Sequence, residues 1–141
     1  MPSKQEVTLL KTMIQEVIKS ELPKAACVLI VSDDGKILAV SRKNDPTDFG
    51  MPGGKVDHPE SPAQAAAREL QEETGLTATN LRQVYVSDDG EYETYTFIGE
   101  ISGQIDTPES GLIRWVAPHV LISGMFGNYN RKLFAKVGIS F

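Results

Sequence analysis

The sequence predicts an α+β domain in which helices pack against a mixed sheet. The chain has 141 residues, the length of one domain. Its composition, 40% hydrophobic and 23% charged, is that of a globular protein with enough apolar residues for a core. Helix-like and strand-like segments follow in the order helix, hairpin, helix, hairpin, strand, helix. We therefore expect residues 1–141 to form a single domain.

Residues 1–22 are predicted to form an N-terminal amphipathic helix. Apolar residues recur there at intervals of three and four, namely Val7, Leu10, Ile14, Val17 and Ile18. Pro23 ends the pattern. Such a helix would cover one side of the core or, alternatively, form a dimer contact. Charged residues interrupt each apolar stretch before Pro23, so we expect neither a secretory signal nor a membrane span, and we predict a cytoplasmic protein.

Two hairpins are predicted where an Asp-Gly turn signal separates strand-like runs. The first hairpin joins residues 25–31 to residues 36–40, and the second joins residues 81–87 to residues 91–101. The single cysteine, Cys27, lies in the first run and is expected to be a small buried side chain. One cysteine allows no internal disulfide, which suits a reducing compartment.

Weaker signals define the remaining segments. Residues 44–46 have the composition of a loop, and Pro52-Gly53-Gly54 contains too many backbone breakers for an uninterrupted central strand. Close approach of the backbone to another group would explain the two glycines. Residues 111–116 are predicted to form a short strand, with Trp115 in the core, and residues 128–137 a final helix.

The central helix has complete start and stop signals. Ser61 is placed as the N-cap, with Pro62 at the first helical position and Gln64 three residues after the cap. Gly75 is the matching stop. At about 100° per residue, one face of this helix is apolar and would pack on the sheet, while three glutamates share an arc of roughly 100°. These are Glu69, Glu72 and Glu73.

The glutamate cluster has two interpretations. Acidic side chains three or four residues apart repel each other, so a solvated charged face is the ordinary explanation. Alternatively, the carboxylates are oxygen ligands for Mg²⁺, which completes its shell with water and phosphate oxygens. The net charge of −5 leaves no global basic surface, so a phosphate substrate would need such a local cation. Neither a membrane nor an extended nucleic acid is expected as a partner.

The spacing of these residues favours the metal interpretation. Counting from Gly54, the chain places Glu60 after five residues and, after seven more, the run Arg68-Glu69-Leu70-Gln71-Glu72-Glu73-Thr74-Gly75-Leu76. This run fits the Nudix box, G-x5-E-x7-R-E-U-x-E-E-x-G-U with U aliphatic, at each fixed position. A chance match of this kind is rarer than roughly one in a million at average composition. Residues 54–76 therefore resemble the MutT/Nudix hydrolases, whose fold is an α/β/α sandwich with a mixed central sheet.

The resemblance implies a divalent metal site. Glu72 and Glu73 correspond to metal ligands, and Glu69 to a further ligand or to the base that orients the attacking water. The backbone carbonyl oxygen of Gly54 corresponds to a metal ligand that is not a carboxylate. The expected ion is Mg²⁺, with Mn²⁺ as a substitute, and two or three ions would neutralise the diphosphate.

Further residues are assigned by the same resemblance. Glu60 and Arg68 are expected to support the metal ligands without binding the ion, with Arg68 fixing the rotamer of a glutamate through charged hydrogen bonds. Many Nudix enzymes add an acid from a later loop, six residues before a tryptophan in MutT-type members, and Glu109 stands six before Trp115. A plain surface loop is the alternative for Glu109. The other candidate acids are Asp106, Glu91 and Glu93.

Substrate contacts are also implied. Arg42 resembles a phosphate-contacting arginine of MutT-type members, with a solvated surface position as the alternative. Asn130 resembles an asparagine that hydrogen-bonds the base, with a helix cap as the alternative. Phe49 and Met51 flank the substrate side of the loop and are candidates to stack on a base, although one of them is expected in the core.

The family hydrolyses a nucleoside diphosphate linked to another moiety. Small size and the correspondences at Arg42, Glu109 and Asn130 favour a nucleoside triphosphate pyrophosphohydrolase that releases the monophosphate and pyrophosphate. The alternative is an ADP-ribose or nucleotide-sugar pyrophosphatase, often a dimer with an extended N-terminal element. A nucleotide sensor without turnover is a third hypothesis, disfavoured by the retained box glutamates. A monomer and a homodimer both remain open.

Overall fold

We analysed a computed structural model that describes residues 3–42, 44–106 and 112–141, with the backbone alone for residues 15–21. The elements in chain order are α1 (Lys4–Glu21), β1 (Lys24–Val28), β2 (Ile37–Arg42), β3 (Asp45–Gly50), β4 (Gly53–Lys55), α2 (Pro62–Thr74), β5 (Thr77–Asp88), β6 (Glu93–Ser102), β7 (Ile113–Val116), α3 (Pro118–Leu121) and α4 (Gly127–Val137).

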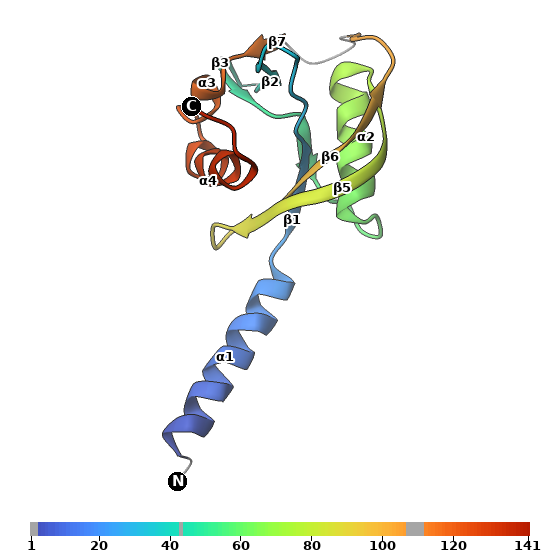
Figure 1. The fold of residues 1–141 in the computed structure, drawn as a ribbon. Coiled ribbons are helices and arrows are strands. Elements are labelled where there is room, and N and C mark those ends of the chain that lie inside the picture. Colours follow the sequence, from blue (N-terminus) through green and yellow to red (C-terminus); the bar gives the residue numbers. More distant parts are fainter. Residues whose placement is uncertain (1–2, 43, 107–111) are drawn as a thin grey trace.

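Two sheets form the middle of the molecule, with α2 on one side and α3 and α4 on the other (Figure 1). The first sheet has the strand order β4-β1-β6-β5 and the second the order β3-β2-β7. Strand β1 runs parallel to β6 and antiparallel to β4. The expected α/β/α arrangement with mixed strand directions is therefore confirmed.

Strand β2 belongs to both halves of the core. Its residue Leu38 packs in a cluster with α2, β1 and β6, which includes Ala66 and Leu70. The flanking Ile37 and Ala39 point the other way, into a second cluster around Leu121, Leu133 and Phe134. Each of these side chains is at most 1% exposed. This alternation is the period-2 pattern of a strand covered on both faces.

Several predicted elements are confirmed. The central helix, the second hairpin and the final helix appear as α2, as β5 with β6, and as α4. The predicted strand at residues 111–116 appears as β7, Ile113–Val116. Cys27 is buried, as expected. The short helix α3 was not predicted, because its four residues are too few to show a helical period.

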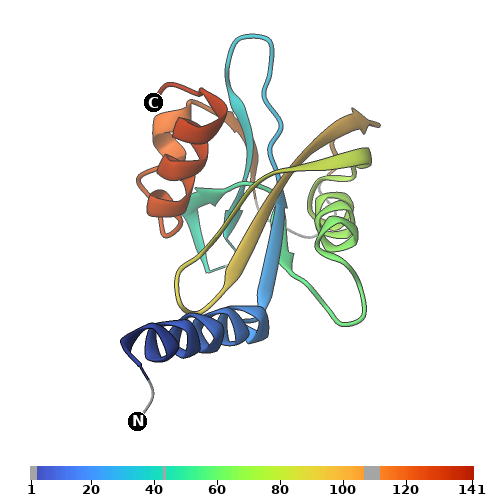
Figure 2. The same cartoon turned by 60° about the horizontal axis from the view of Figure 1, so that its bottom comes forward.

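Helix α1 forms as predicted but does not cover the core. It projects away from the body of the molecule in both views (Figures 1 and 2). Leu10 is 53% exposed and Ile14 is 57% exposed. The expected covering role is wrong because α2 on one side and α3 and α4 on the other already cover the sheets. None of the helices in the described part of the chain combines the length and apolar character that a membrane crossing requires.

The first predicted hairpin is only partly present. Its turn forms, with Gly35 at φ +83° and Ser32 accepting a hydrogen bond from the backbone N–H of Lys36. Beyond a single bridge between Val31 and Ile37, however, the two strands separate into different sheets. The prediction of a continuous hairpin is therefore wrong, because β1 pairs instead with β4 and β6.

Two further expectations were wrong, and both concern edge strands. Asp45 and Pro46 lie in β3 and not in a loop, since an edge strand tolerates a proline that cannot donate to a neighbour. Trp115 is 42% exposed and not a core residue, because β7 is the other edge of that sheet. The glycine-rich segment gives only the three-residue edge strand β4, which confirms that it is no continuous central strand.

Candidate active site

Helix α2 starts and ends at the residues that the sequence indicates. The side chain of Ser61 accepts from the backbone N–H of Gln64, whose own side chain accepts from the N–H of Ser61. Gly75 ends the helix at φ +81°, a left-handed conformation that glycine adopts without strain. These caps fix the register of α2 and therefore the direction in which its glutamates point.

Arg68 and Glu60 form an ion pair with two hydrogen bonds. The Nη2 atom of Arg68 lies 2.7 Å from Oε1 of Glu60, and its Nε lies 3.1 Å from Oε2. These hydrogen bonds, together with one from the N–H of Asp57, lower the pKa of Glu60 from 4.5 to about 2. The forked geometry fixes the plane of the guanidinium group.

The same guanidinium reaches two of the three clustered glutamates. Its Nη1 atom donates to Oε1 of Glu69 at 3.0 Å and lies 3.3 Å from Oε2 of Glu72. Burial raises the pKa of Glu69, and the bond from Arg68 opposes that shift. The structure thus places Arg68 between Glu60 and two of the clustered carboxylates.

The adjacent glycines Gly53 and Gly54 bring the main chain close to carboxylates of α2. The N–H of Gly53 donates to Oε1 of Glu73 at 2.8 Å. A Cβ atom added to Gly54 would lie 2.6 Å from Cδ of Glu69, closer than real Cβ contacts allow. The close approach is therefore to Glu69 at Gly54, and to the main chain of β1 at Gly53, where an added Cβ would collide with the carbonyl oxygen of Ala26.

The donor set fits a hard divalent cation. Three carboxylates and the main chain of Gly54 supply only oxygen atoms, the ligand type that Mg²⁺ prefers. Within the described residues, no three acidic, histidine or cysteine side chains are already gathered as a metal cluster. Glu69 and Glu72 are turned to Arg68 instead, and Glu73 to Gly53. The side chain of Glu72 is 57% exposed, so it has room to change rotamer.

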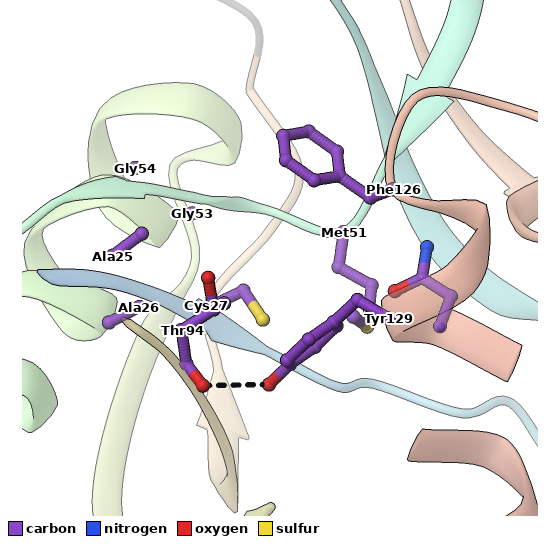
Figure 3. Close-up of a pocket in the computed structure, with 10 residues that line it drawn as sticks. Ala25, Ala26, Cys27, Met51, Gly53, Gly54, Thr94, Phe126 and Tyr129 are labelled. Carbon is purple, nitrogen blue, oxygen red and sulfur yellow. Dashed lines mark hydrogen bonds between the residues drawn. The ribbon is translucent and has the colours of Figure 1, made fainter. Parts of the chain in front are cut away.

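A mostly apolar cavity of about 120 Å³ lies beside the two glycines. Figure 3 shows Met51, Phe126 and Tyr129 around it, with Gly53 and Gly54 at its border. Cys27, Thr94 and Asn130 add polar groups to the lining. The cavity therefore connects the C-terminal helix to the Nudix box.

Asn130 lines this cavity and has one side-chain atom without a partner among the described residues. The residue is 2% exposed, and its Nδ2 donates to the carbonyl oxygen of Leu121 at 2.9 Å. That bond fixes the orientation of the amide, since the reverse orientation would put two acceptors together. Its Oδ1 atom has no hydrogen-bond partner among the described residues. The helix-cap alternative is wrong, because Phe126 and not Asn130 occupies the N-cap of α4.

Arg42 and Phe49 lie at different distances from this cavity. Arg42 does not line the cavity but lies near one of its lining residues, with the guanidinium 5.9 Å from the ring centroid of Phe126 and Nη1 3.6 Å from Asp48. Phe49 packs against the second core cluster and lines a separate hollow with His119. The structure therefore does not bring Phe49 together with Asn130, because its strand directs it away from the cavity.

The predicted loop acid and its alternatives are spread out. Glu109 lies outside the described residues. The backbone N–H of Asp106 bonds the carbonyl oxygen of Thr74 at 2.6 Å, next to the end of α2. Glu91 is exposed on the β5–β6 turn, and Glu93 accepts from the hydroxyl of Tyr95.

Two cavity residues were missed at the level of sequence. Phe126, the N-cap of α4, and Tyr129 both precede Asn130, but their spacing follows no core pattern that would have singled them out. An aromatic residue close to a candidate base-contacting asparagine is the one available signal.

Comparisons with known proteins agree with this geometry. The family model for the NUDIX domain matches residues 21–137. An 8-oxo-dGTP diphosphatase of Haemophilus influenzae is 33% identical over 124 residues, which cover 81% of this chain and 90% of that protein. An ADP-ribose pyrophosphatase of Bacillus subtilis is 40% identical over 77 residues, or 52% of this chain and 40% of that protein.

The fold is also found among solved structures. A MutT NUDIX hydrolase from Burkholderia pseudomallei superimposes with a TM-score of 0.68 and 26% identity, over 83% of this chain and 98% of that one. The chain therefore belongs to the Nudix family, and it is a hydrolase with pyrophosphohydrolase activity. Enzymes of this family generally depend on a divalent metal.

Proposed function

We propose that the protein hydrolyses nucleoside triphosphates to the monophosphate and pyrophosphate, using Mg²⁺. The observation that carries the proposal is that Asn130 lines an apolar cavity beside Gly53 and Gly54, while its buried Oδ1 atom has no partner among the described residues. A nucleobase would fill such a cavity and donate an N–H to that oxygen, because a buried acceptor left unpaired is costly. The phosphates would then lie over the Nudix box.

The base would be held mainly by contacts with apolar side chains. Met51 and the half-exposed ring of Phe126 line the cavity and offer stacking surfaces. Arg42 lies 5.9 Å from that ring, near enough to the cavity to serve a phosphate. Because Asn130 offers an acceptor, we expect bases with an N–H at the matching position to bind best.

The Nudix box would handle the diphosphate. Glu69, Glu72, Glu73 and the carbonyl of Gly54 would hold Mg²⁺, which supplies charge neutralisation and activation of water when bound. Glu69, whose pKa is raised by burial, would orient that water or take its proton if it is not a ligand. Arg68 would keep Glu69 in place while Glu60 holds Arg68. Glu109 stays a candidate for a further acid.

A second candidate is an ADP-ribose or nucleotide-sugar pyrophosphatase. A neighbouring hollow of about 200 Å³ shares Thr94, Phe126 and Tyr129 with the first cavity and is lined also by polar groups such as Asn128 and Lys132. Such a hollow suits the hydroxyl groups of a second sugar. The Bacillus subtilis relative named for ADP-ribose supports the same alternative. A sensor without turnover is less well supported, because the box glutamates are all present.

The products decide between the two candidates. The protein would be incubated with Mg²⁺ and a panel of nucleoside triphosphates, ADP-ribose and nucleotide sugars, and the products separated by chromatography. Pyrophosphate with a monophosphate supports the first candidate, and two monophosphates from ADP-ribose or a sugar nucleotide support the second. Lack of hydrolysis across the panel, with nucleotide binding retained, would favour a sensor.

Asn130→Ala tests the base-binding step separately. Removal of the acceptor should raise KM for the preferred nucleotide roughly fivefold to tenfold and leave kcat nearly unchanged. Lys136→Ala is the matched control, because Lys136 lies on the same helix, is exposed and lines neither hollow. An unchanged KM in Asn130→Ala would show that the base binds elsewhere.

We also propose that the enzyme is cytoplasmic and acts on small nucleotides, without a membrane or an extended nucleic acid as partner. Of monomer and homodimer, the exposed side chains of α1 favour the homodimer. Leu9, Leu10, Met13 and Ile14 are each more than half exposed. In a parallel helix pair, Glu6 of one copy would lie near Lys11 of the other, so the charges are complementary to a second copy of α1.

A further inference from the structure

Tyr129 lies between the two hollows at the first turn of α4. Its ring lines the cavity that contains Asn130 and also the polar hollow of about 200 Å³ beside the β5–β6 turn. A second aromatic ring, that of Tyr85, meets it edge-on at 5.2 Å between centroids. Tyr129 directly precedes Asn130 in the helix, so any displacement of Tyr129 also displaces Asn130.

The hydroxyl of Tyr129 binds strand β6 at two points. It donates to the carbonyl oxygen of Thr94 at 3.1 Å, a bond drawn in Figure 3. It also lies 2.7 Å from Oγ1 of Thr96. A phenol has one proton, so when both bonds are made the Thr96 hydroxyl donates to the tyrosine oxygen. The phenol proton is therefore used within the protein and is not offered to a substrate.

Cys27 completes this group of hydrogen bonds. Its sulfur lies 3.2 Å from Oγ1 of Thr96 and donates to the carbonyl oxygen of Tyr95 at 3.7 Å. Burial raises the pKa of this thiol to about 11, so it keeps its proton at neutral pH. The bonds thus join β1, β6 and α4 immediately behind the cavity.

The first turn of α4 depends on such tertiary bonds. Its N-cap, Phe126, makes no side-chain cap hydrogen bond. Later turns are fixed by Leu133 and Phe134, which are fully buried in the second core cluster. The first turn has instead the Tyr129 hydroxyl and the bond from Asn130 to Leu121.

We propose that Tyr129 is a positioning residue for base recognition. Its bonds to Thr94 and Thr96 hold the first turn of α4 at the distance from β6 at which Oδ1 of Asn130 faces the bound base. This inference rests on the proposed function, because it assumes that the cavity takes a nucleobase. Tyr129 acts through Asn130 and makes no hydrogen bond to the substrate itself.

The test compares variants that remove or keep the bond. Tyr129→Phe keeps the ring and should raise KM for the preferred nucleotide about fivefold, with kcat nearly unchanged. Thr96→Val should give a similar rise, whereas Thr96→Ser, which keeps the hydroxyl, should behave like the parent. Tyr85→Phe is the matched control, because it removes a hydroxyl from the neighbouring ring.

An abasic substrate separates positioning from a general loss of structure. KM for ribose 5-triphosphate, which has no base to meet Asn130, should be the same in Tyr129→Phe and in the parent. A KM that rises equally for both substrates, or not at all for the nucleotide, would overturn the proposal.

Hydrogen exchange tests, without any substrate, whether the bonds of the Tyr129 hydroxyl hold the first turn of α4 in place. Amides of residues 129–131 should exchange faster in Tyr129→Phe than in the parent, while those of residues 133–137 should be unchanged. Equal exchange in the first turn would overturn the proposal even if the nucleotide is hydrolysed. Absence of nucleotide hydrolysis in the parent, with faster exchange in the variant, would instead contradict the proposed function and leave the positioning link supported.

Discussion

The carboxylate of Glu69 occupies the space that a side chain on Gly54 would need. A Cβ on Gly54 would lie 2.6 Å from both Cδ and Oε1 of Glu69. We expect Gly54→Ala to displace this glutamate and to lower kcat/KM by roughly 100-fold or more, since misplaced catalytic groups cost that much. Steady-state kinetics checks this. Gly50→Ala is the control, because its nearest neighbour would be 3.9 Å away; equal effects of the two substitutions would contradict the expectation.

Glu72→Gln tests the proposed metal ligand. A neutral amide is a poor ligand for a hard dication, so activity should fall by more than roughly 100-fold while the unfolding midpoint changes little. Gln71→Ala, at the adjacent exposed position, should retain activity. The parent should also lose activity in excess chelator and regain it with Mg²⁺. Turnover by Glu72→Gln at the rate of the parent would show that Glu72 is no ligand.

Arg68→Lys tests the fork that joins Glu60 to the glutamate cluster. Lysine keeps the charge but cannot make the two bonds to Glu60 and the bond to Glu69 in one plane. We expect kcat to fall roughly 10- to 100-fold, as for other residues that orient metal ligands. Arg82→Lys, on the exposed side of β5, is the control. If kcat is unchanged, Arg68 does not orient the catalytic glutamates.

Glu60 should make stability depend on pH in acid. Its pKa is about 2 when folded and 4.5 ordinarily, so the unfolded chain binds its proton first as pH falls. The stabilisation is therefore complete above about pH 4.5 and is lost as the pH falls toward 2. Urea unfolding at several pH values between 2 and 6 would measure this loss. Glu60→Gln should be less stable than the parent at pH 6 and should lose less stability between these limits; parallel profiles would contradict the assignment.

Self-association through α1 is expected to depend on its exposed apolar side chains. Leu10→Glu with Ile14→Glu should shift the protein from dimer to monomer, because charged residues in an apolar contact are strongly disfavoured. Sedimentation equilibrium would give the molecular mass. Thr12→Glu is the control, since Thr12 lies about 200° around the helix from Leu10. A monomeric parent, or a dimer that survives the double substitution, would contradict this expectation.

The parts that sequence predicts well are those with local causes. Ser61 and Gly75 fix α2 through bonds within a few residues, so the register of the glutamates followed directly from spacing. The separation of β1 from β2 could not be predicted in this way, because it depends on which distant strand pairs best with β1. The same holds for the exposure of Trp115, which is decided by the edge position of its strand.

The cavity, too, combines features that local sequence predicts with features that depend on tertiary packing. Asn130 was identified by its resemblance to a family position. Its bond to the carbonyl oxygen of Leu121, which leaves Oδ1 without a partner among the described residues, joins α4 to α3 and could not be predicted from local sequence. Phe126, and not Phe49, lines the cavity, which depends on how the chain before α4 packs and not on any local pattern. Ala65 is fully buried although it lies on the acidic side of α2, because it packs in the first core cluster.

The division of the core by strand β2 has an evolutionary consequence. The groups proposed for phosphate chemistry belong to α2 and β4, on one side of this strand, and most of those proposed for the base belong to α4 and its cap, on the other. A substitution in α4 can therefore alter which nucleotide is preferred without disturbing the machinery that cleaves it. Under the proposed function, selection would therefore act on substrate choice and on catalytic power through different parts of the chain.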